Sequence, residues 1–254
     1  MQIKILGGHG GVSQGFQTTS FLIDNHLLID AGSVASTLSI QSQAQVDHIL
    51  ISHAHLDHIK DLAFICDNCF GMRALPFEVY GHKTVLNLIM KHLFNDSIWP
   101  DFSKIPSLDN PTIRLTSIEP EKPMRVGPYT VTPVKVQHPN DALGYILESA
   151  QTCIVFTLDT GPTEKIWEIA KSKKNLKAIF TEVSFPNHLQ KVANLSDHHT
   201  PQTLAQEISK MPKDVPIILT HFKPNFKEQL RIEIEALNES RLTLLESDGM
   251  VFHF

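Results

Sequence analysis

The stretch that most constrains the fold is residues 52–58, which hold three histidines and an aspartate in the order His-x-His-x-Asp-His. Residues 46–51 before it are apolar and β-branched, which predicts a buried strand. Residues 59–69 after it carry apolar side chains at helical spacing, which predicts a helix. The motif therefore lies where a strand ends and a helix begins, so its side chains can converge. Since a solvated loop seldom holds four potential ligands in six positions, we interpret the motif as a metal site.

Potential ligands or acid–base residues also follow four later segments that the sequence predicts to be strands. These strands, 131–137, 153–158, 176–181 and 215–220, are followed by His138, Asp159, Glu182 and His221. Each of these residues alone would be read as an ordinary core or turn residue. Active-site residues on sheets gather at one end of the strands, so the repetition predicts that these side chains meet the 52–58 motif.

Four short blocks carry a resemblance to a known family. They are HAHLDHI (53–59), WPDF (99–102), EVSFPN (182–187) and HHTP (198–201). The first block resembles the metallo-β-lactamase fold superfamily of binuclear metallohydrolases. The later blocks narrow the match, so that the whole set resembles the class II 3′,5′-cyclic-nucleotide phosphodiesterases over nearly the whole chain.

The resemblance implies a complete set of metal ligands. Its pattern assigns the first metal to His53, His55 and His138, the second to Asp57, His58 and His221, and a bridging role to Asp159. It also implies that Asp30 supports the site from behind the ligands. No ligand position is missing or substituted, which argues against a non-catalytic scaffold. Imidazoles with carboxylates suit two zinc ions best, with manganese or iron as alternatives.

The same resemblance implies that Asp57, Glu182 and His198 are catalytic. His198 would give a proton to the departing 3′ oxygen, and Glu182 would orient it. Without the resemblance, residues 197–200 read as the N-cap region of a helix with solvated histidines, and His199 is assigned no role. One departure from the family pattern is Asp61, which replaces a usual glycine and could add negative charge near the second metal.

Two further motifs favour structural roles. The glycine-rich loop 7–11 lacks the lysine and hydroxyl residue of a phosphate-binding P-loop, so it predicts a tight turn, with a loop over the active site as the alternative. His9 in this loop is not predicted to be a ligand. Cys66 and Cys69 have the spacing of a zinc or redox pair, but no second pair accompanies them, so they are predicted to be ordinary cysteines.

The periodicity of apolar residues predicts an α/β fold with mixed sheets. Helices are predicted at 82–94, 164–173, 201–211 and 226–239, and a hairpin is predicted from 19–24 and 26–30. Pattern and resemblance together predict an αββα sandwich, in which two mixed β-sheets are flanked by helices.

We expect residues 1–254 to form one domain with a loop-rich insertion around 95–128, where proline recurs. Trp99 and Phe102 lie in this insertion. Aromatic side chains in a loop favour packing on a cleft or on a partner, so we expect a lid or a homodimer contact there.

The composition excludes several classes of protein. With 42% hydrophobic and 19% charged residues the chain reads as an ordinary globular protein, and its net charge of −5 without a basic run argues against binding long nucleic acid. Three cysteines do not suggest a disulfide framework, so a reducing, cytoplasmic location is expected. No apolar run approaches membrane-spanning length.

The function that these observations favour is metal-dependent hydrolysis of a small cyclic nucleotide, cAMP or cGMP, to the nucleoside 5′-monophosphate. A tRNase Z-like RNA endonuclease of the same fold is one alternative, and it should carry a basic RNA-binding arm. A non-catalytic, metal-dependent interaction protein is the other.

Overall fold

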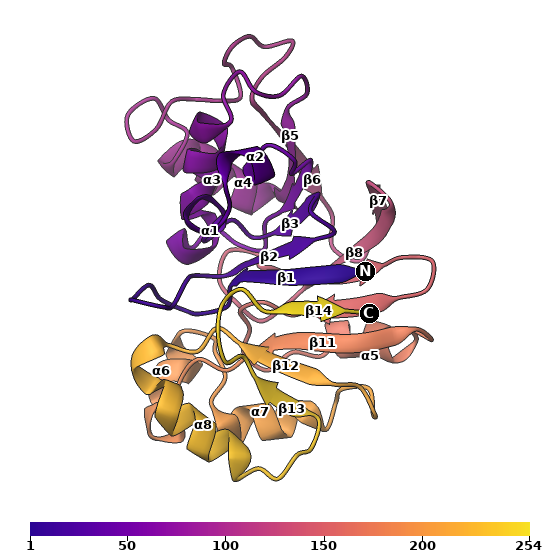
Figure 1. Ribbon diagram of the computed structural model, residues 1–254. Helices are drawn as coiled ribbons and strands as arrows, with labels where there is room; N and C mark the ends of the chain where they lie inside the picture. The colour runs from indigo at the N-terminus through magenta and orange to yellow at the C-terminus, as the bar shows by residue number, and fades with distance from the viewer.

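A computed structural model describes all residues, 1–254, and shows two seven-stranded β-sheets packed face to face (Figure 1). The strands of the first sheet, in spatial order, are β14 (Val251–His253), β1 (Gln2–Gly7), β2 (Ser20–Ile23), β3 (Leu27–Ile29), β4 (His48–Leu50), β5 (Phe77–His82) and β6 (Ile113–Ile118). Those of the second sheet are β13 (Leu242–Leu244), β12 (Ile217–Thr220), β11 (Leu176–Glu182), β10 (Cys153–Phe156), β9 (Leu143–Glu148), β8 (Tyr129–Lys135) and β7 (Met124–Val126).

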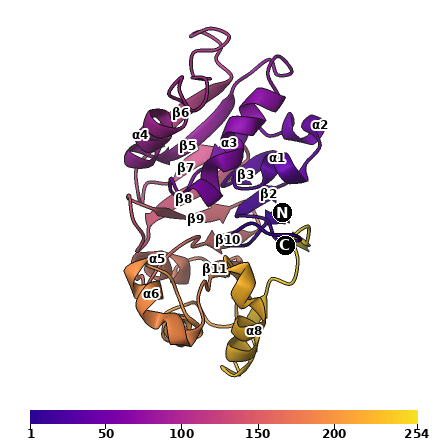
Figure 2. The ribbon, with the colours of Figure 1, turned by 90° about the vertical axis from the view of Figure 1, so that its left-hand side faces the viewer.

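Helices cover the outer face of each sheet, so the predicted αββα sandwich is confirmed (Figures 1 and 2). Over the first sheet lie α1 (Val34–Thr37), α2 (Ile40–Gln43), α3 (Leu56–Asn68) and α4 (Lys83–His92). Over the second lie α5 (Lys165–Lys171), α6 (Gln190–Leu195), α7 (Pro201–Ile208) and α8 (Lys227–Glu235), with short 3₁₀ turns at Asn187–Leu189 and Pro224–Phe226. No helix is both long and apolar enough to cross a bilayer.

Alternating side chains of the strands divide the apolar core into two layers. In β2, Phe21 and Ile23 face the second sheet, whereas Leu22 packs beneath the helices of the first. The period of two along a strand sends neighbouring side chains to opposite faces, so a sheet covered on both sides buries the side chains of both faces. All four residues of β2 are buried, as this arrangement requires.

Both sheets are mixed, and the carboxyl ends of their parallel strands lie at one edge of the molecule. Strands β3 to β6 are parallel to one another, as are β10 to β13. The carboxyl ends of parallel strands meet at a common edge of a sheet, which is where α/β proteins place their ligands. The segments after β4, β10, β11 and β12 all begin there, and so do the segments after β1 and β8, which run in the same direction as these strands.

The segment around 95–128, expected to be loop-rich, is only partly a loop. Strands β6 and β7 lie inside it, and each forms the outer strand of one sheet. The remaining loop packs on the helices of the first sheet, where the Trp99 ring meets the Phe64 ring of α3 edge-on at 5.3 Å. The expected lid or dimer contact at this loop stays a prediction.

Candidate metal centre

The connection from β4 to α3 turns four side chains of the predicted motif toward one site. His53 lies in the loop after β4, and His55 occupies the N-cap position of α3. Asp57 and His58 follow in the first turn of this helix, as the sequence predicted. His53 and His58 are fully buried, whereas His55 is exposed, so the motif reaches from the interior to the surface.

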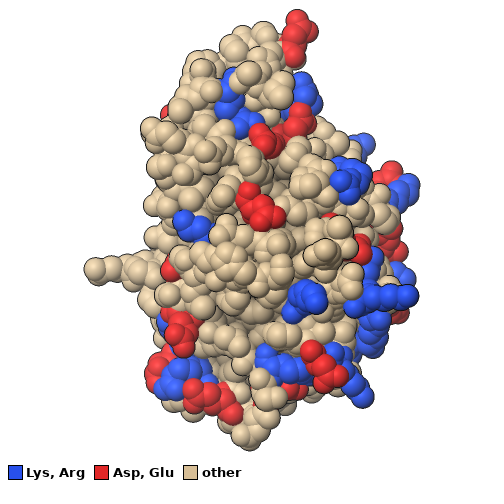
Figure 3. Space-filling view, turned by 45° about the vertical axis from the view of Figure 1, so that its right-hand side comes forward, with Lys and Arg blue, Asp and Glu red and all other residues tan.

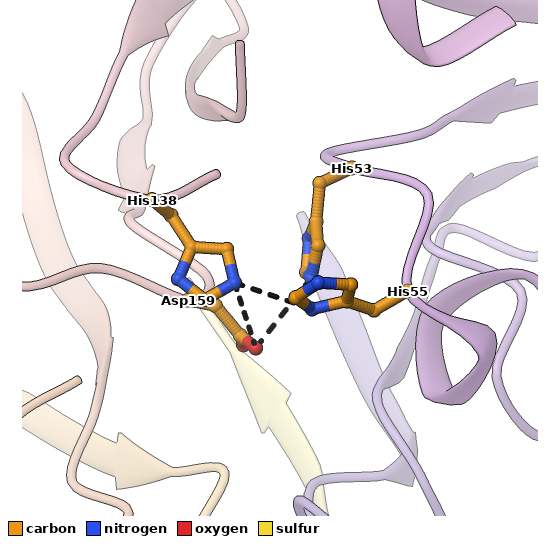
Figure 4. Close-up of side chains that lie close together, drawn as sticks. All are labelled: His53, His55, His138 and Asp159. Atoms are coloured by element: carbon orange, nitrogen blue, oxygen red, sulfur yellow. Dashed lines mark hydrogen bonds and ion pairs between the residues drawn. The ribbon is translucent and has the colours of Figure 1, made fainter. Parts of the chain in front are cut away.

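The first cluster joins this motif to the ends of two strands of the second sheet. His53, His55, His138 and Asp159 each place a ligand atom within 4.8 Å of the others. Figure 4 shows the His138 ring and the Asp159 carboxylate directed toward His53 and His55 from the opposite side. The His138 Nε2 atom lies 3.3 Å from Nδ1 of His55.

A second cluster consists of Asp57, His58 and His221, whose ligand atoms also lie within 4.8 Å of one another. Asp159 stands between the two clusters. Its Oδ2 atom is 3.0 Å from Nε2 of His221 and 3.3 Å from Nε2 of His58, and it is 3.7 Å from Nε2 of His53 in the first cluster. One carboxylate therefore lies within reach of both groups.

Three histidines of these clusters are held by hydrogen bonds at the ring nitrogen that faces away from the centre. Nδ1 of His58 lies 2.6 Å from Oδ2 of Asp30, and Nδ1 of His138 lies 3.0 Å from the Asp197 carbonyl oxygen. Nδ1 of His221 is 3.0 Å from the Thr19 hydroxyl. At His58 and His138 the partner is a carboxylate or carbonyl oxygen, so Nδ1–H donates and Nε2 faces the centre, the arrangement typical of metal-ligating histidines.

Several atoms of the two clusters lack hydrogen-bond partners. They include Nε2 of His53, His58 and His221 and Oδ1 of Asp159, all of which are buried. Buried polar atoms are almost always satisfied in folded proteins, so a concentration of unsatisfied nitrogen and oxygen atoms calls for a cation. The imidazole and carboxylate donors fit divalent metal ions.

Burial favours the neutral form of two rings of the first cluster. It lowers the pKa of His53 well below its ordinary value, and it also lowers the pKa of His138. A neutral imidazole has a free lone pair, which is the form that binds a metal. Burial acts in the opposite direction on Asp159, but the neighbouring His221 and His58 outweigh it, so the pKa of Asp159 is well below its ordinary value and the carboxylate is ionised.

The sequence matches the family model described as "Beta-lactamase superfamily domain" over residues 25–222, which is most of the chain. The chain belongs to the β-lactamase superfamily. Its relatives include proteins named as metallo-hydrolases and phosphodiesterases, and the chain is a hydrolase of this superfamily.

Particular members of the superfamily resemble the chain over almost its full length. A probable 3′,5′-cyclic-nucleotide phosphodiesterase of Yersinia pestis is 25% identical, over 94% of this chain and 82% of the relative. The crystal structure of unliganded yeast PDE1 matches with a TM-score of 0.79 at 20% identity, covering 98% of each chain. The short form of human tRNase Z matches with a TM-score of 0.69 at 18% identity, covering 100% of this chain and 99% of that one.

Glu182 and His198 form a buried pair beside the two ligand clusters. Glu182 ends β11, and its Oε1 lies 2.6 Å from Nδ1 of His198. Burial would lower the pKa of His198, but the Glu182 carboxylate outweighs it and raises that pKa above its ordinary value. Ser184 Oγ donates to Oε2 of Glu182 at 2.8 Å, so the carboxylate is fixed on both oxygens.

His198 also lies close to the second cluster. Its ring stacks on that of His221 with centroids 5.5 Å apart, and a ligand atom of His198 lies within 4.8 Å of Asp159 and His221. The geometry therefore allows His198 either to bind a metal or to meet a substrate at its free nitrogen. Measuring metal content distinguishes these two roles.

Several residues around the centre adopt the left-handed backbone conformation that side chains other than glycine seldom take. Asp30 has φ of 58°, Leu158 has 56°, Asp197 has 50° and His221 has 63°. Such strain costs about 1–3 kcal/mol at each position and gathers at functional sites, where the surrounding structure holds it. At this centre the left-handed conformation sets the direction of the Asp30 and His221 side chains. At Leu158 it sets the direction of the chain that leads to Asp159.

The glycine-rich loop after β1 forms part of the wall of the centre. A Cβ atom at Gly10 would lie 2.8 Å from the His221 carbonyl oxygen and 2.9 Å from its Nε2. The backbone at Gly10 therefore packs directly against His221, and the role of this loop over an active site stays a prediction. His9 packs its ring between Phe16 and Phe222, which agrees with a structural role.

Asp61, which replaces a usual glycine, does not face the second cluster. Its Oδ2 accepts hydrogen bonds from the backbone of Ala35 at 2.8 Å and of Ser36 at 3.3 Å, so it caps the short helix α1. Lys60 pairs with its other oxygen at 3.0 Å. The negative charge that the sequence suggested near the second metal is therefore satisfied elsewhere.

Sequence reasoning missed the residues that hold the clusters in place. Ser52 hydrogen-bonds both Asp30 and the His53 ring, Thr19 holds His221, and Lys223 donates to the Gly10 carbonyl oxygen at 2.6 Å. Ser52 is the first residue of the 52–58 stretch, so its position next to His53 was a usable signal. Thr19 lies 202 residues from its partner, and no local pattern marks it.

Proposed function

We propose that this chain is a binuclear metal-dependent phosphodiesterase that hydrolyses 3′,5′-cyclic nucleotides to nucleoside 5′-monophosphates. The observation that carries the proposal is the buried Glu182–His198 pair beside two ligand clusters that share Asp159. The relatives named as cyclic-nucleotide phosphodiesterases support the same substrate class.

The proposed ligands fall into the two clusters described above. His53, His55 and His138 would hold one ion, Asp57, His58 and His221 would hold the other, and Asp159 would bridge them. Two divalent ions held in this way would supply Lewis-acid activation of the phosphoryl group and of the attacking water. Zinc suits the imidazole-rich set best, with manganese or iron as alternatives.

The protein's own groups then perform two tasks. Asp57, which is only partly buried, would accept a proton from the attacking water. His198 would donate a proton from Nε2 to the departing 3′ oxygen, a role supported by Glu182, which holds its Nδ1 and favours the protonated ring. Glu182 thus acts as a positioning residue.

His198→Ala tests this assignment. A ribose 3′ alkoxide leaves poorly without a proton, so the turnover of cAMP should fall by about 10²–10⁴-fold. Bis-p-nitrophenyl phosphate, whose leaving group needs no proton, should be far less affected, and elemental analysis should still find two metal ions per chain. His188→Ala, which removes an exposed histidine, is the matched control and should change neither rate.

Equal losses on both substrates together with the loss of one metal ion would make His198 a ligand. One metal ion would then be held by Asp159, His198 and His221, whose ligand atoms also lie within 4.8 Å of one another. If the purified wild-type protein hydrolysed no cyclic nucleotide at all, the proposed substrate class would be wrong.

A further inference from the structure

A largely apolar cavity of about 440 Å³ opens between α3, α4 and the loop that follows α4. Six of its eight lining residues are hydrophobic, among them Leu56 of α3, Leu88 of α4 and Ile98 of the loop. The only polar ones are His92 and Asn140. This volume lies in the usual range of small-ligand sites, and such sites combine apolar walls with a few polar groups.

The cavity shares two of its walls with the metal centre. Leu56 lies between His55 and Asp57 in the chain, and Asn140 lies two residues after His138. The rings of His55 and His138 are 5.0 Å apart. The two segments that carry these rings also line the cavity, through Leu56 and Asn140. A molecule held at the centre therefore has this cavity as its neighbour.

Leu56 and Ile98 at this cavity leave 66% and 65% of their surface exposed. Exposed apolar residues that gather at a concave site beside polar ligands mark a place where a partly apolar ligand binds. The Trp99 ring beside Ile98 packs edge-on against Phe64 of α3, which holds this part of the loop against the helix.

We propose that this cavity binds the nucleobase of the substrate, an inference that rests on the function proposed above. A nucleobase is a flat ring that can pack between Leu56, Leu88 and Ile98, and its edge carries both hydrogen-bond donors and acceptors. The Asn140 amide both donates and accepts, so it matches such an edge. The cavity is therefore a specificity site next to the phosphate-binding centre.

Ile98→Asn tests the apolar contact, because it removes hydrophobic surface at an exposed position without adding charge. The two substrates compared are cAMP and methyl ribofuranoside 3,5-cyclic phosphate, which lacks the base. Losing the contact should raise the KM for cAMP about 3–10-fold, since burying an aliphatic side chain against a ligand is worth about 1 kcal/mol or more. The KM for the base-free compound should change less than about twofold by the same argument.

Asn140→Gly provides a second variant, and glycine tolerates the left-handed backbone of this position, where φ is 61°. It should alter the ratio of cAMP to cGMP turnover, because the edges of the two bases differ. Ile232→Asn, the same substitution at an exposed site on α8, is the matched control and should leave all constants unchanged.

The outcomes separate this inference from the proposed function. If the wild type hydrolyses cAMP but both cavity variants retain its KM and its cAMP to cGMP ratio, the nucleobase site is wrong while the proposed function stands. If the wild type hydrolyses bis-p-nitrophenyl phosphate but neither cyclic compound, the proposed function fails, and the nucleobase site fails with it.

Discussion

At the scale of single residues, the centre depends on a buried carboxylate that belongs to neither ligand cluster. Asp30 is fully buried and accepts three hydrogen bonds, from the Ser52 backbone, from the Ser52 hydroxyl and from Nδ1 of His58. Ser52 in turn contacts the His53 ring at 3.0 Å. Asp30 therefore orients a histidine of each cluster, His58 directly and His53 through Ser52. This arrangement agrees with the supporting role expected for Asp30.

Asp30→Asn should weaken the metal centre without removing any proposed ligand. An amide cannot accept from all three donors, and its NH₂ group would face a donor, so a buried group loses its partner at a cost of about 1–3 kcal/mol. Such a loss behind a ligand typically lowers metal affinity about 10–100-fold. Competition with a chelator measures this affinity, and Asp109→Asn at an exposed loop position is the control. Unchanged affinity would show that Asp30 serves only the fold.

At the scale of elements, the sequence predicted what is local and missed what depends on distant packing. The strand–motif–helix unit of β4 and α3 was predictable because its apolar periodicity and its ligands lie within 25 consecutive residues. The three-residue strand β7 was not, since its place depends on pairing with β8 and its own sequence has little pattern. Likewise Lys223 and Gly10 meet only because the segments after β12 and β1 share an edge.

The glycine-rich loop after β1 leaves no room for a side chain at Gly10. In Gly10→Ala the new Cβ atom would meet the His221 carbonyl oxygen at 2.8 Å and Lys223 Nζ at 2.9 Å, distances that force the loop or His221 to move. We expect the metal content to fall from two ions to one, because His221 belongs to only one cluster. Elemental analysis and cAMP turnover measure the two effects.

Gly11→Ala is the matched control for this variant. Its Cβ atom would lie 3.3 Å from Cδ of Pro224, which a small shift accommodates, so metal content and activity should stay near those of the wild type. Full metal content and activity in Gly10→Ala would show that the loop moves freely and is no part of the wall.

At the scale of the whole molecule, the charge distribution argues for a small substrate. The net charge is −5, and on the face shown in Figure 3 the basic side chains have acidic ones among them. The loop between β1 and β2, which projects from the edge of the molecule (Figure 1), contains no lysine or arginine from residue 8 to residue 19. Binding RNA requires lysine or arginine contacts to phosphates, and this loop offers none.

Salt dependence separates the two substrate classes. A protein that grips RNA neutralises many phosphates, and one with 6–10 phosphate contacts loses about 10³–10⁵-fold in affinity between 50 and 200 mM salt. A cyclic nucleotide carries one phosphate, so the kcat/KM for cAMP should change by less than about threefold over the same range. The test compares cAMP with a pre-tRNA 3′ trailer across this salt series. Efficient trimming of the trailer with a steep salt slope, and no turnover of cAMP, would instead assign the centre to RNA processing.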